Sequence, residues 1–232
     1  MLIQFKEVSK VYQMGEVAVH ALHQNSFTID SGEFVSIVGP SGSGKTTLLD
    51  IIGCLSRPTT GCYLFKEEEV QNLSDRDLAR IRNKKIGFIF QTFHLLGRNT
   101  ALANVALPLF YAGLPKEARM ARAKEALSQV GLSDRIHHRP NQLSGGQQQR
   151  VAVARALVNH PDIILADEPT GNLDSKSGGE IIELLHALHR NGHTLILVTH
   201  DKELAGRTDR TITIKDGCIV SNEENRKHPK RV

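Results

Sequence analysis

A glycine-rich stretch near residue 40 carries the residue types needed to bind phosphate. It reads Gly39-Pro40-Ser41-Gly42-Ser43-Gly44-Lys45-Thr46-Thr47 and fits the pattern G-x-x-x-x-G-K-[ST]. Glycines let consecutive backbone N–H groups turn inward around an anion. The Lys45 ammonium can reach the β- and γ-phosphates of a nucleotide, and the Thr46 hydroxyl can bind Mg²⁺. The stretch therefore predicts a site for nucleotide phosphates.

Two adjacent carboxylates form a second candidate site. Asp167 and Glu168 directly follow the apolar run Ile163-Ile164-Leu165-Ala166. P-loop proteins hold Mg²⁺ with a carboxylate at a strand end beside the phosphate loop. We therefore assign Asp167 to the metal, through a water molecule, and Glu168 to polarising the attacking water as general base. The alternative is a pair of solvated carboxylates at a strand end.

The segment Leu143-Ser144-Gly145-Gly146-Gln147 precedes an Ala/Val-rich run that predicts a helix over Gln147–Asn159. A serine and two glycines at a helix N-terminus make a second anion cradle. One chain then has two phosphate-binding surfaces but only one G-x-x-x-x-G-K-[ST] loop. This is consistent with two chains that meet so that each cradle covers the nucleotide of the other.

The elements that position these residues alternate between strand and helix. Phe34–Val38 predicts a buried strand ahead of the glycine loop, and Thr46–Ile52 predicts the helix after it. Similar apolar runs occur at Ile86–Phe90, Ile163–Asp167 and Thr194–Val198. Apolar strands that alternate with helices predict an α/β fold with a mostly parallel sheet. Strands at Leu2–Val8 and near Asn25–Ile29 predict an additional β part at the N-terminus.

The chain between residues 92 and 160 shows little strand signal. Its clearest element is a helix over Pro115–Val130, with proline at its start and Gly131 after its end. We therefore expect one domain with a core at residues 1–91 and 161–222. A helical subdomain at about 92–160 interrupts this core, and a basic tail at 223–232 follows it.

Composition narrows the classes of function. The chain has 232 residues, of which 40% are hydrophobic and 23% charged, as in ordinary globular proteins. No apolar run approaches the ~18 residues of a membrane helix, and the N-terminus lacks a signal peptide, so we expect a cytoplasmic chain. Aromatic residues make up 5% and tryptophan is absent, which argues against a nucleic-acid partner. Three widely spaced cysteines indicate neither a disulfide framework nor a metal site.

Taken together in their order, the motifs resemble the ATP-binding subunit of ABC transporters over essentially the whole chain. The matching elements are Tyr12, Gly39–Thr47, Gln91, Leu143–Gln147, Ile163–Glu168, Gly171-Asn172-Leu173-Asp174 and His200. The resemblance implies an α/β P-loop NTPase core with a mostly parallel sheet, an N-terminal antiparallel β part and an inserted helical subdomain. It also implies ATP and Mg²⁺ as cofactors and ATP hydrolysis as the reaction.

The same resemblance implies a role for three further residues in binding and hydrolysing ATP. Tyr12 would stack on adenine. Gln91 would touch Mg²⁺ or the water and sense the γ-phosphate. His200 would hydrogen-bond the γ-phosphate and hold Glu168 and the attacking water in line.

It further implies an ATP-dependent, head-to-tail homodimer. Ser144 and Gly146, with Gly145 and Gln147 in the same motif, would contact the γ-phosphate of the partner's nucleotide. Asp174 would pair with the opposite protomer near its phosphate loop. ATP then joins the two chains, and hydrolysis lets them separate.

The tetrad Gly171-Asn172-Leu173-Asp174 replaces the Ser-Ala-Leu-Asp common elsewhere in the family. Together with Leu143–Arg150 and Phe88–Gln91, it resembles the macrolide-export and lipoprotein-release (MacB/LolD) branch. That branch implies a location on the inner face of the membrane. The partner would be a permease with few membrane helices and a large extracytoplasmic domain, and a periplasmic adaptor is a further candidate partner. We expect the permease to dock beside Gln91, at Phe93, Leu95 and Leu96.

Three alternatives stand beside this interpretation. A small-molecule P-loop kinase would need no Leu143–Gln147 motif. A repair or ribosome-associated ABC protein usually has a long coiled coil or two cassettes. A regulatory ABC ATPase, which acts with a permease-like partner in cell division without moving a substrate, would share every catalytic motif.

Overall fold

The computed structural model describes residues 1–225, which form two compact units. The first contains residues 1–82 together with 194–225, and the second contains residues 83–193. Residues 226–232, most of the expected basic tail, lie outside the described residues. Within residues 1–225, no helix is both long enough and apolar enough to cross a bilayer.

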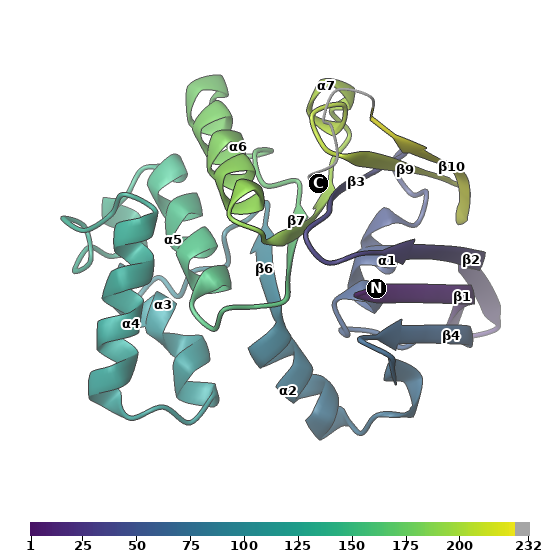
Figure 1. The fold of residues 1–232 in the computed structure, drawn as a ribbon, viewed down its shortest axis with the longest axis horizontal. Helices are drawn as coiled ribbons and strands as arrows, with labels where there is room; N and C mark the ends of the chain where they lie inside the picture. The colour runs from purple at the N-terminus through teal and green to yellow at the C-terminus, as the bar shows by residue number, and fades with distance from the viewer. Residues whose placement is uncertain (226–232) are drawn as a thin grey trace. The chain divides into compact units, whose positions relative to one another are not determined.

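An antiparallel sheet opens the first unit. Its strands are β1 (Ile3–Met14), β2 (Val17–Ile29), β4 (Thr60–Phe65) and β5 (Glu68–Glu69), in the order β2-β1-β4-β5. Figure 1 shows the first three of these side by side. The ring of Phe5 stacks on Phe27 with centroids 4.6 Å apart and tilts against Tyr63 at 4.7 Å. The contact between Phe5 and Phe27 lies within the two predicted runs, and the pairing of β1 with β2 continues beyond them to Met14 and Val17.

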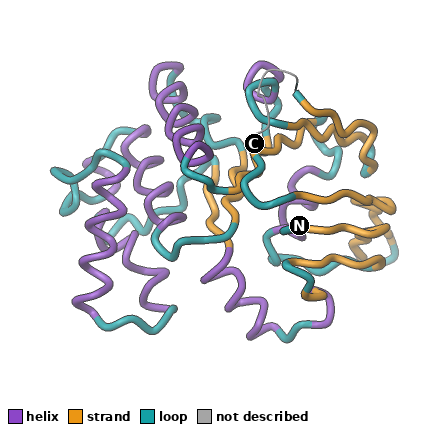
Figure 2. The backbone as a smooth tube through the Cα atoms, viewed as in Figure 1, coloured by secondary structure: helices purple, strands orange, loops and turns teal. Residues whose placement is uncertain are grey.

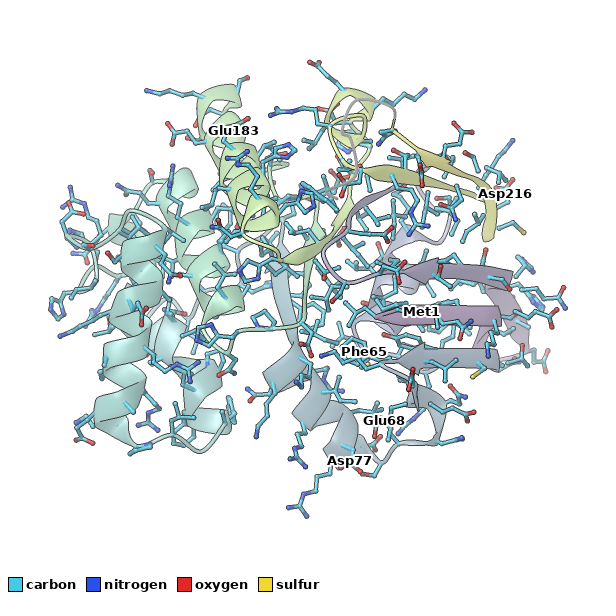
Figure 3. All side chains as sticks on the ribbon, in the orientation of Figure 1. Met1, Phe65, Glu68, Asp77, Glu183 and Asp216 are labelled. Carbon is cyan, nitrogen blue, oxygen red and sulfur yellow. The ribbon has the colours of Figure 1, made fainter. Side chains whose placement is uncertain are left out.

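A mostly parallel group of strands completes the first unit. β3 (Phe34–Val38), β8 (Thr194–Val198), β9 (Arg210–Lys215) and β10 (Cys218–Glu224) lie in the order β10-β9-β3-β8. β3 runs parallel to both β8 and β9. Asp216 and Gly217 form the turn of the β9–β10 hairpin with φ angles of 48° and 77°, and Asp216 is labelled in Figure 3.

Three helices belong to this unit in whole or in part. α1 (Lys45–Ile52) follows β3, and the short α7 (Lys202–Ala205) follows β8 and packs on β3. The 3₁₀ turn η1 (Val70–Asn72) precedes α2 (Asp75–Lys85), which leads into the second unit. Ser74 Oγ accepts a hydrogen bond from Asp77 N at 3.2 Å and so caps the start of α2.

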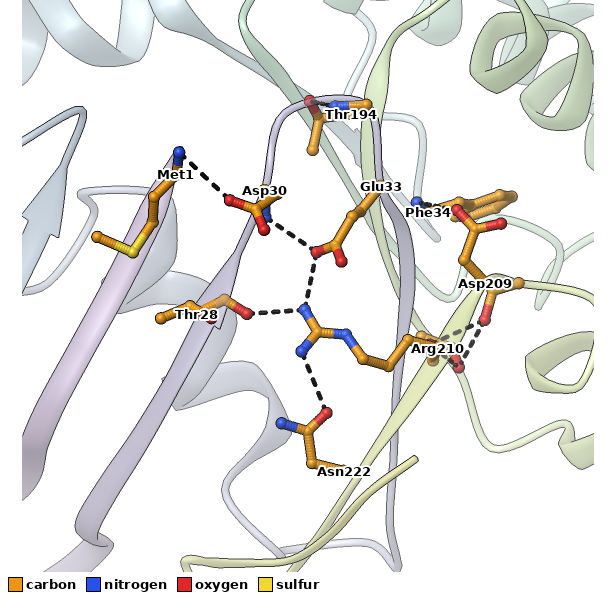
Figure 4. Close-up of polar contacts among 12 residues, drawn as sticks. Met1, Thr28, Asp30, Glu33, Phe34, Thr194, Asp209, Arg210 and Asn222 are labelled. Carbon is orange, nitrogen blue, oxygen red and sulfur yellow. Dashed lines mark hydrogen bonds and ion pairs between the residues drawn. The ribbon is translucent and has the colours of Figure 1, made fainter. Parts of the chain in front are cut away.

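A polar network around Arg210 fixes the amino end of β3 (Figure 4). The Arg210 guanidinium contacts Glu33 Oε2 at 2.8 Å and donates to the Thr28 carbonyl at 2.7 Å. Asp209 Oδ2 accepts from the Phe34 amide at 2.9 Å. These bonds tie the ends of β2, β3 and β9 together, so β3 enters the sheet at a fixed position.

The second unit is mainly helical, as the purple segments of Figure 2 show. β6 (Ile86–Phe90) and β7 (Ile163–Asp167) form a parallel pair. Between them lie α3 (Ala101–Tyr111), α4 (Lys116–Gln129), the 3₁₀ turn η2 (Pro140–Gln142) and α5 (Gly145–Leu157), and α6 (Ser175–Arg190) follows β7.

Helix α5 forms the centre of the second unit. It packs on α3, α4, α6 and β6. The four residues from Val151 to Ala154 are all fully buried, so the helix is covered on every side at this point. Small Val and Ala side chains allow the neighbouring elements to approach, which explains the composition of this segment.

Candidate functional site

The predicted phosphate loop joins β3 to α1 in the first unit. Gly42 and Gly44 lie in the left-handed region with φ angles of 75° and 100°, and Gly44 caps α1. An added Cβ at Gly42 would meet no atom within 4 Å, so the loop is open there. The first turn of α1 has no acidic residue. Its N-terminal partial positive charge is therefore available to an anion, and the loop suits a phosphate group.

Lys45 folds back over the loop. Its ammonium donates to the carbonyl oxygens of Gly39 at 2.8 Å and Pro40 at 2.7 Å. Two carbonyls are weak partners for a full positive charge compared with an anionic phosphate. The ammonium is thus held at the loop and able to exchange these partners for a phosphate.

The β9–β10 turn braces the phosphate loop from the side. The Gly217 amide donates to the Ser43 carbonyl at 3.0 Å. The Gly217 carbonyl in turn accepts from the His23 amide at 2.9 Å and from Asn25 Nδ2 at 2.8 Å. Asn25 is buried, and its Oδ1 accepts from the Ile219 amide at 2.7 Å. The loop is therefore anchored through the turn to β2.

Tyr12 lies on β1, and its side chain is 37% exposed. The Lys10 ammonium lies over the ring at 4.9 Å from its centroid and donates to the Arg57 carbonyl at 2.8 Å. Because a hydrogen bond fixes this ammonium, the cation–π contact holds the Tyr12 ring in place. The contact occupies one face of the ring.

His200 also belongs to the first unit and follows β8. In the parallel register, Ile37 of β3 is paired with Val198 of β8. Because both strands run in the same direction, the phosphate loop and His200 leave the sheet at the same edge. The first unit therefore contains Tyr12, the phosphate loop and His200, and its parallel strands bring the loop and His200 to one edge of the sheet.

Gln91, Asp167 and Glu168 belong to the second unit. Phe90 of β6 is paired with Asp167 of β7, so Gln91 and Glu168 both follow this pair at one edge. Glu168 has a φ of 44°, which non-glycine residues rarely adopt. Such backbone strain is common at functional sites, where the surrounding structure supports it.

The second anion cradle is the N-terminus of α5. Ser144 Oγ accepts from the Gln147 amide at 3.3 Å, and Gln147 Oε1 accepts from the Ser144 amide at 3.0 Å. This reciprocal capping box starts the helix at Gly145, two residues before the predicted start at Gln147. Gly146 is buried, and a Cβ added there would lie 3.0 Å from Ser177 Cβ of α6. The cradle is thus packed directly against α6.

Asp174 caps α6. Its Oδ1 accepts from the Ser177 amide at 3.0 Å, and this bond lowers the pKa of the Asp174 carboxyl. The carboxylate is exposed, so it can cap the helix and still meet another chain. Its predicted partner in a second protomer stays a prediction.

Two residues that the sequence did not single out fix the segment around Gln91. Gln149 is fully buried on α5, and its Nε2 donates to the carbonyls of Pro169 at 2.6 Å and Phe90 at 3.3 Å. Arg155 donates to the carbonyls of Phe93 at 2.7 Å and His94 at 2.6 Å. Burial lowers the pKa of Arg155. A charged residue within the Ala/Val-rich run could have revealed Arg155, whereas Gln149 lies among polar neighbours and no local signal distinguishes it.

The candidate metal-binding residues Thr46, Gln91 and Asp167 all offer oxygen atoms. Oxygen ligands suit Mg²⁺, which usually takes only one or two protein ligands and completes its shell with phosphates and water. Within residues 1–225, no group of three or more His, Cys, Asp or Glu side chains could hold a metal by itself. By their chemistry these side chains suit a Mg²⁺ ion that arrives with a nucleotide, with Thr46 in the first unit and Gln91 and Asp167 in the second.

Comparison with known proteins gives consistent matches. The family model described as ABC transporter matches residues 22–171. An uncharacterized ABC transporter ATP-binding protein of Thermotoga maritima is 58% identical over 222 residues, covering 96% of this chain and 95% of that protein. The macrolide export ATP-binding/permease protein MacB 2 of Aeromonas hydrophila is 54% identical over 218 residues. That match covers 94% of this chain and 34% of the relative, so the chain spans about a third of its length.

Solved structures resemble this one over nearly the whole chain. A dimeric ATP-binding cassette in a post-hydrolysis state, bound to ADP and Pi, matches with a TM-score of 0.89 and 48% identity. The match covers 98% of this chain and 100% of that one. A second dimeric structure, of a bacterial ABC transporter cassette, matches with a TM-score of 0.88 and 49% identity. These neighbours confirm the predicted fold class.

Proposed function

The chain belongs to the ABC transporter family as an ATP-binding and ATP-hydrolysing subunit, and on this premise we propose that it powers a separate membrane permease. The transported substrate would be exported, or extracted from the membrane, as a lipoprotein, peptide or drug-like molecule. The observation that carries the proposal is the phosphate loop, with two left-handed glycines, Lys45 and the open N-terminus of α1 in one place.

The first unit would bind the nucleotide. Backbone amides of Gly39–Thr47 would surround the phosphates, and the Lys45 ammonium would leave the loop carbonyls for the β- and γ-phosphates. Adenine would stack on the face of Tyr12 that Lys10 leaves open. His200 would donate a hydrogen bond to the γ-phosphate.

Hydrolysis would depend on carboxylate and amide oxygens of the second unit. When bound, Mg²⁺ neutralises charge on the β- and γ-phosphates. Thr46, Gln91 and Asp167 would hold it, with Asp167 acting through water. The Glu168 carboxylate would accept a proton from the attacking water, and its strained backbone supports a fixed orientation of that carboxylate.

Two chains would sandwich two ATP·Mg²⁺ head to tail. The two dimeric neighbours at 48% and 49% identity support this arrangement. Ser144 and Gly146 at the N-terminus of α5 would bind the γ-phosphate held by the partner chain. Loss of this bridge and charge repulsion after hydrolysis would then open the dimer.

A permease would hold the chain at the inner face of the membrane. The MacB relatives are named as ATP-binding/permease proteins, whereas the Thermotoga relative is matched over 95% of its length as an ATP-binding protein. This favours a transport subunit over the cell-division alternative. The exposed Leu96, with half-buried Phe93 and Leu95, would form the docking surface. The permease would have few membrane helices and a large extracytoplasmic domain, and a periplasmic adaptor would complete the assembly.

The Glu168→Gln variant tests the catalytic part of this proposal. Loss of a general base lowers kcat by about 10²- to 10⁴-fold. We expect this loss with nucleotide affinity retained, so that ATP-bound dimers accumulate and can be measured by size-exclusion chromatography. Hydrolysis at the wild-type rate would exclude Glu168 as the base.

The Lys45→Ala variant is the matched control for binding. It removes the phosphate-binding ammonium, so we expect weaker nucleotide binding by calorimetry and no ATP-induced dimer. Unchanged nucleotide affinity would contradict the proposed role of the phosphate loop. Purifying the Glu168→Gln chain from its own membranes with ATP·Mg²⁺ would then identify the permease.

A further inference from the structure

The tetrad that departs from the common Ser-Ala-Leu-Asp pattern lies against Gln91. Asn172 Nδ2 donates to the Gln91 carbonyl oxygen at 3.1 Å. Gln91 Nε2 donates to Asn172 Oδ1 at 3.2 Å. The two residues are 81 positions apart in the sequence, and both bonds lie within the second unit.

This pair determines which end of the Gln91 amide is free. A backbone carbonyl can only accept, so the Gln91 carbonyl fixes the Asn172 amide with its nitrogen toward that oxygen. Asn172 Oδ1 must then face the Gln91 side chain, which can meet it only with Nε2. Within residues 1–225, Gln91 Oε1 has no hydrogen-bond partner, and the side chain is exposed. The oxygen end is therefore the end available to a ligand.

Gly171 provides the space for this arrangement. A Cβ added there would lie 2.7 Å from Gln91 Nε2 and 2.9 Å from its Cδ. Gly171 has no left-handed φ, so the backbone itself does not require glycine. Its amide donates to the Glu168 carbonyl at 3.0 Å, which fixes the backbone at this point. Both residues that differ from the common pattern thus contact Gln91.

We propose that Asn172 is a positioning residue that presents Gln91 Oε1 to Mg²⁺ or the attacking water, with Gly171 leaving room for the Gln91 side chain. The inference rests on the proposed function, which gives Gln91 that role. Without the pair, the amide can rotate and offer either end, and only the oxygen end can bind a cation. The orientation of Gln91 therefore depends on the segment from Gly171 to Asp174.

The decisive test is a double-mutant cycle with Asn172→Leu and Gln91→Ala. Leucine has nearly the shape of asparagine but makes no hydrogen bond. We measure ATPase kcat and the Mg²⁺ concentration that gives half-maximal activity at saturating ATP. We expect Asn172→Leu to lower kcat about tenfold and to raise the half-maximal Mg²⁺ concentration about threefold, as expected for two lost hydrogen bonds. In the Gln91→Ala background it should change neither quantity, because the two residues act as one unit.

Gly171→Ala gives an independent perturbation that leaves Asn172 intact. The atoms it would meet belong to the end of a flexible side chain, so Gln91 moves aside while the fold is retained. We expect the same rise in Mg²⁺ requirement as for Asn172→Leu. Gly179→Ala on α6 is the matched control, because a Cβ there meets no atom within 4 Å, and its kinetics should equal those of the wild type.

The outcomes separate this inference from the proposed function. If Gln91→Ala is impaired but Asn172→Leu and Gly171→Ala match the wild type, the positioning role is wrong and the role of Gln91 stands. If Gln91→Ala itself leaves kcat and Mg²⁺ dependence unchanged, both are wrong. If Asn172→Leu lowers kcat and thermal stability equally in both backgrounds without altering Mg²⁺ dependence, Asn172 is only structural and the inference is overturned.

Discussion

The two units hold their candidate site residues by different means. In the first unit, the backbone holds the phosphate loop in place: left-handed glycines shape the loop, and main-chain bonds to Gly217 anchor it. In the second unit, side chains hold the site residues in place. Gln149 and Arg155 bind main-chain carbonyls around Gln91, and Asn172 orients its amide.

This difference affects how easily each set of site residues is found in the sequence and how easily a substitution alters its function. A site built from backbone needs a contiguous motif, so its residues are close in sequence and hard to replace one by one. A site built from side chains can be altered by a single substitution while the fold persists. The second unit is therefore the part of the chain where relatives can adjust catalysis.

Gly44→Ala should break the backbone-built site most strongly. A Cβ at Gly44 would lie 2.6 Å from the Ala21 carbonyl oxygen, and its φ of 100° strains any L-residue. We expect a loss of about 3 kcal/mol in the free energy of unfolding, from strain and clash together. Urea denaturation without nucleotide measures it.

Gly42→Ala is the matched control for that variant. Its φ is also positive, but a Cβ there would meet no atom within 4 Å. Strain alone should cost about 1 kcal/mol. Equal losses for the two variants would mean that the contact with Ala21 does not matter.

Gln149→Leu should have the next largest effect and tests the side-chain-built site. Leucine keeps the bulk of the buried side chain but leaves the carbonyls of Phe90 and Pro169 without their donor. We expect a loss of about 2 kcal/mol in unfolding free energy, measured by urea denaturation. Gln148→Leu, which loses one bond to the Leu143 carbonyl, should lose less. The reverse order would contradict the role of Gln149.

Asp174→Asn should give the smallest effect, visible only at acid pH. The cap bond lowers the pKa of Asp174 in the folded chain. Its contribution to stability is therefore present above the ordinary aspartate pKa and is lost as pH falls through the lower folded value. Asparagine caps the helix at any pH. Between about pH 5 and pH 3, a range that includes the ordinary aspartate pKa, the thermal midpoint of the variant should fall less than that of the wild type. If the thermal midpoints of both proteins fall equally with pH, ionisation of Asp174 does not contribute to stability.

Sequence reasoning succeeded where one property runs along consecutive residues. The bounds of β3, β6, β7 and β8 agree with the predicted strands because each is a short, mostly apolar run. The predicted family and α/β fold are confirmed by the family model and the solved neighbours. The roles of the site residues stay predictions, although the phosphate loop and His200 share one sheet edge, and Gln91 and Glu168 follow one strand pair.

What the sequence could not reveal depends on distant partners or on solvent. The first four residues of β2 are exposed, so Val17–His20 gave no strand pattern. The capping box moved the start of α5 to Gly145. Gln149 contacts a carbonyl 59 residues away, and the partner of Gln91 is 81 residues away. No local spacing can indicate such pairs.

The bond from Gly217 to Ser43 also bears on how the chain is made. The phosphate loop is synthesised early, but the turn that holds it belongs to the β9–β10 hairpin near the end of the chain. Gly217 of this turn also binds Asn25, which lies 192 residues earlier in the sequence. A growing chain on the ribosome carries the complete phosphate-binding motif long before it carries its support. Nucleotide binding should therefore arise only when this hairpin has emerged, so that unfinished chains do not hold ATP.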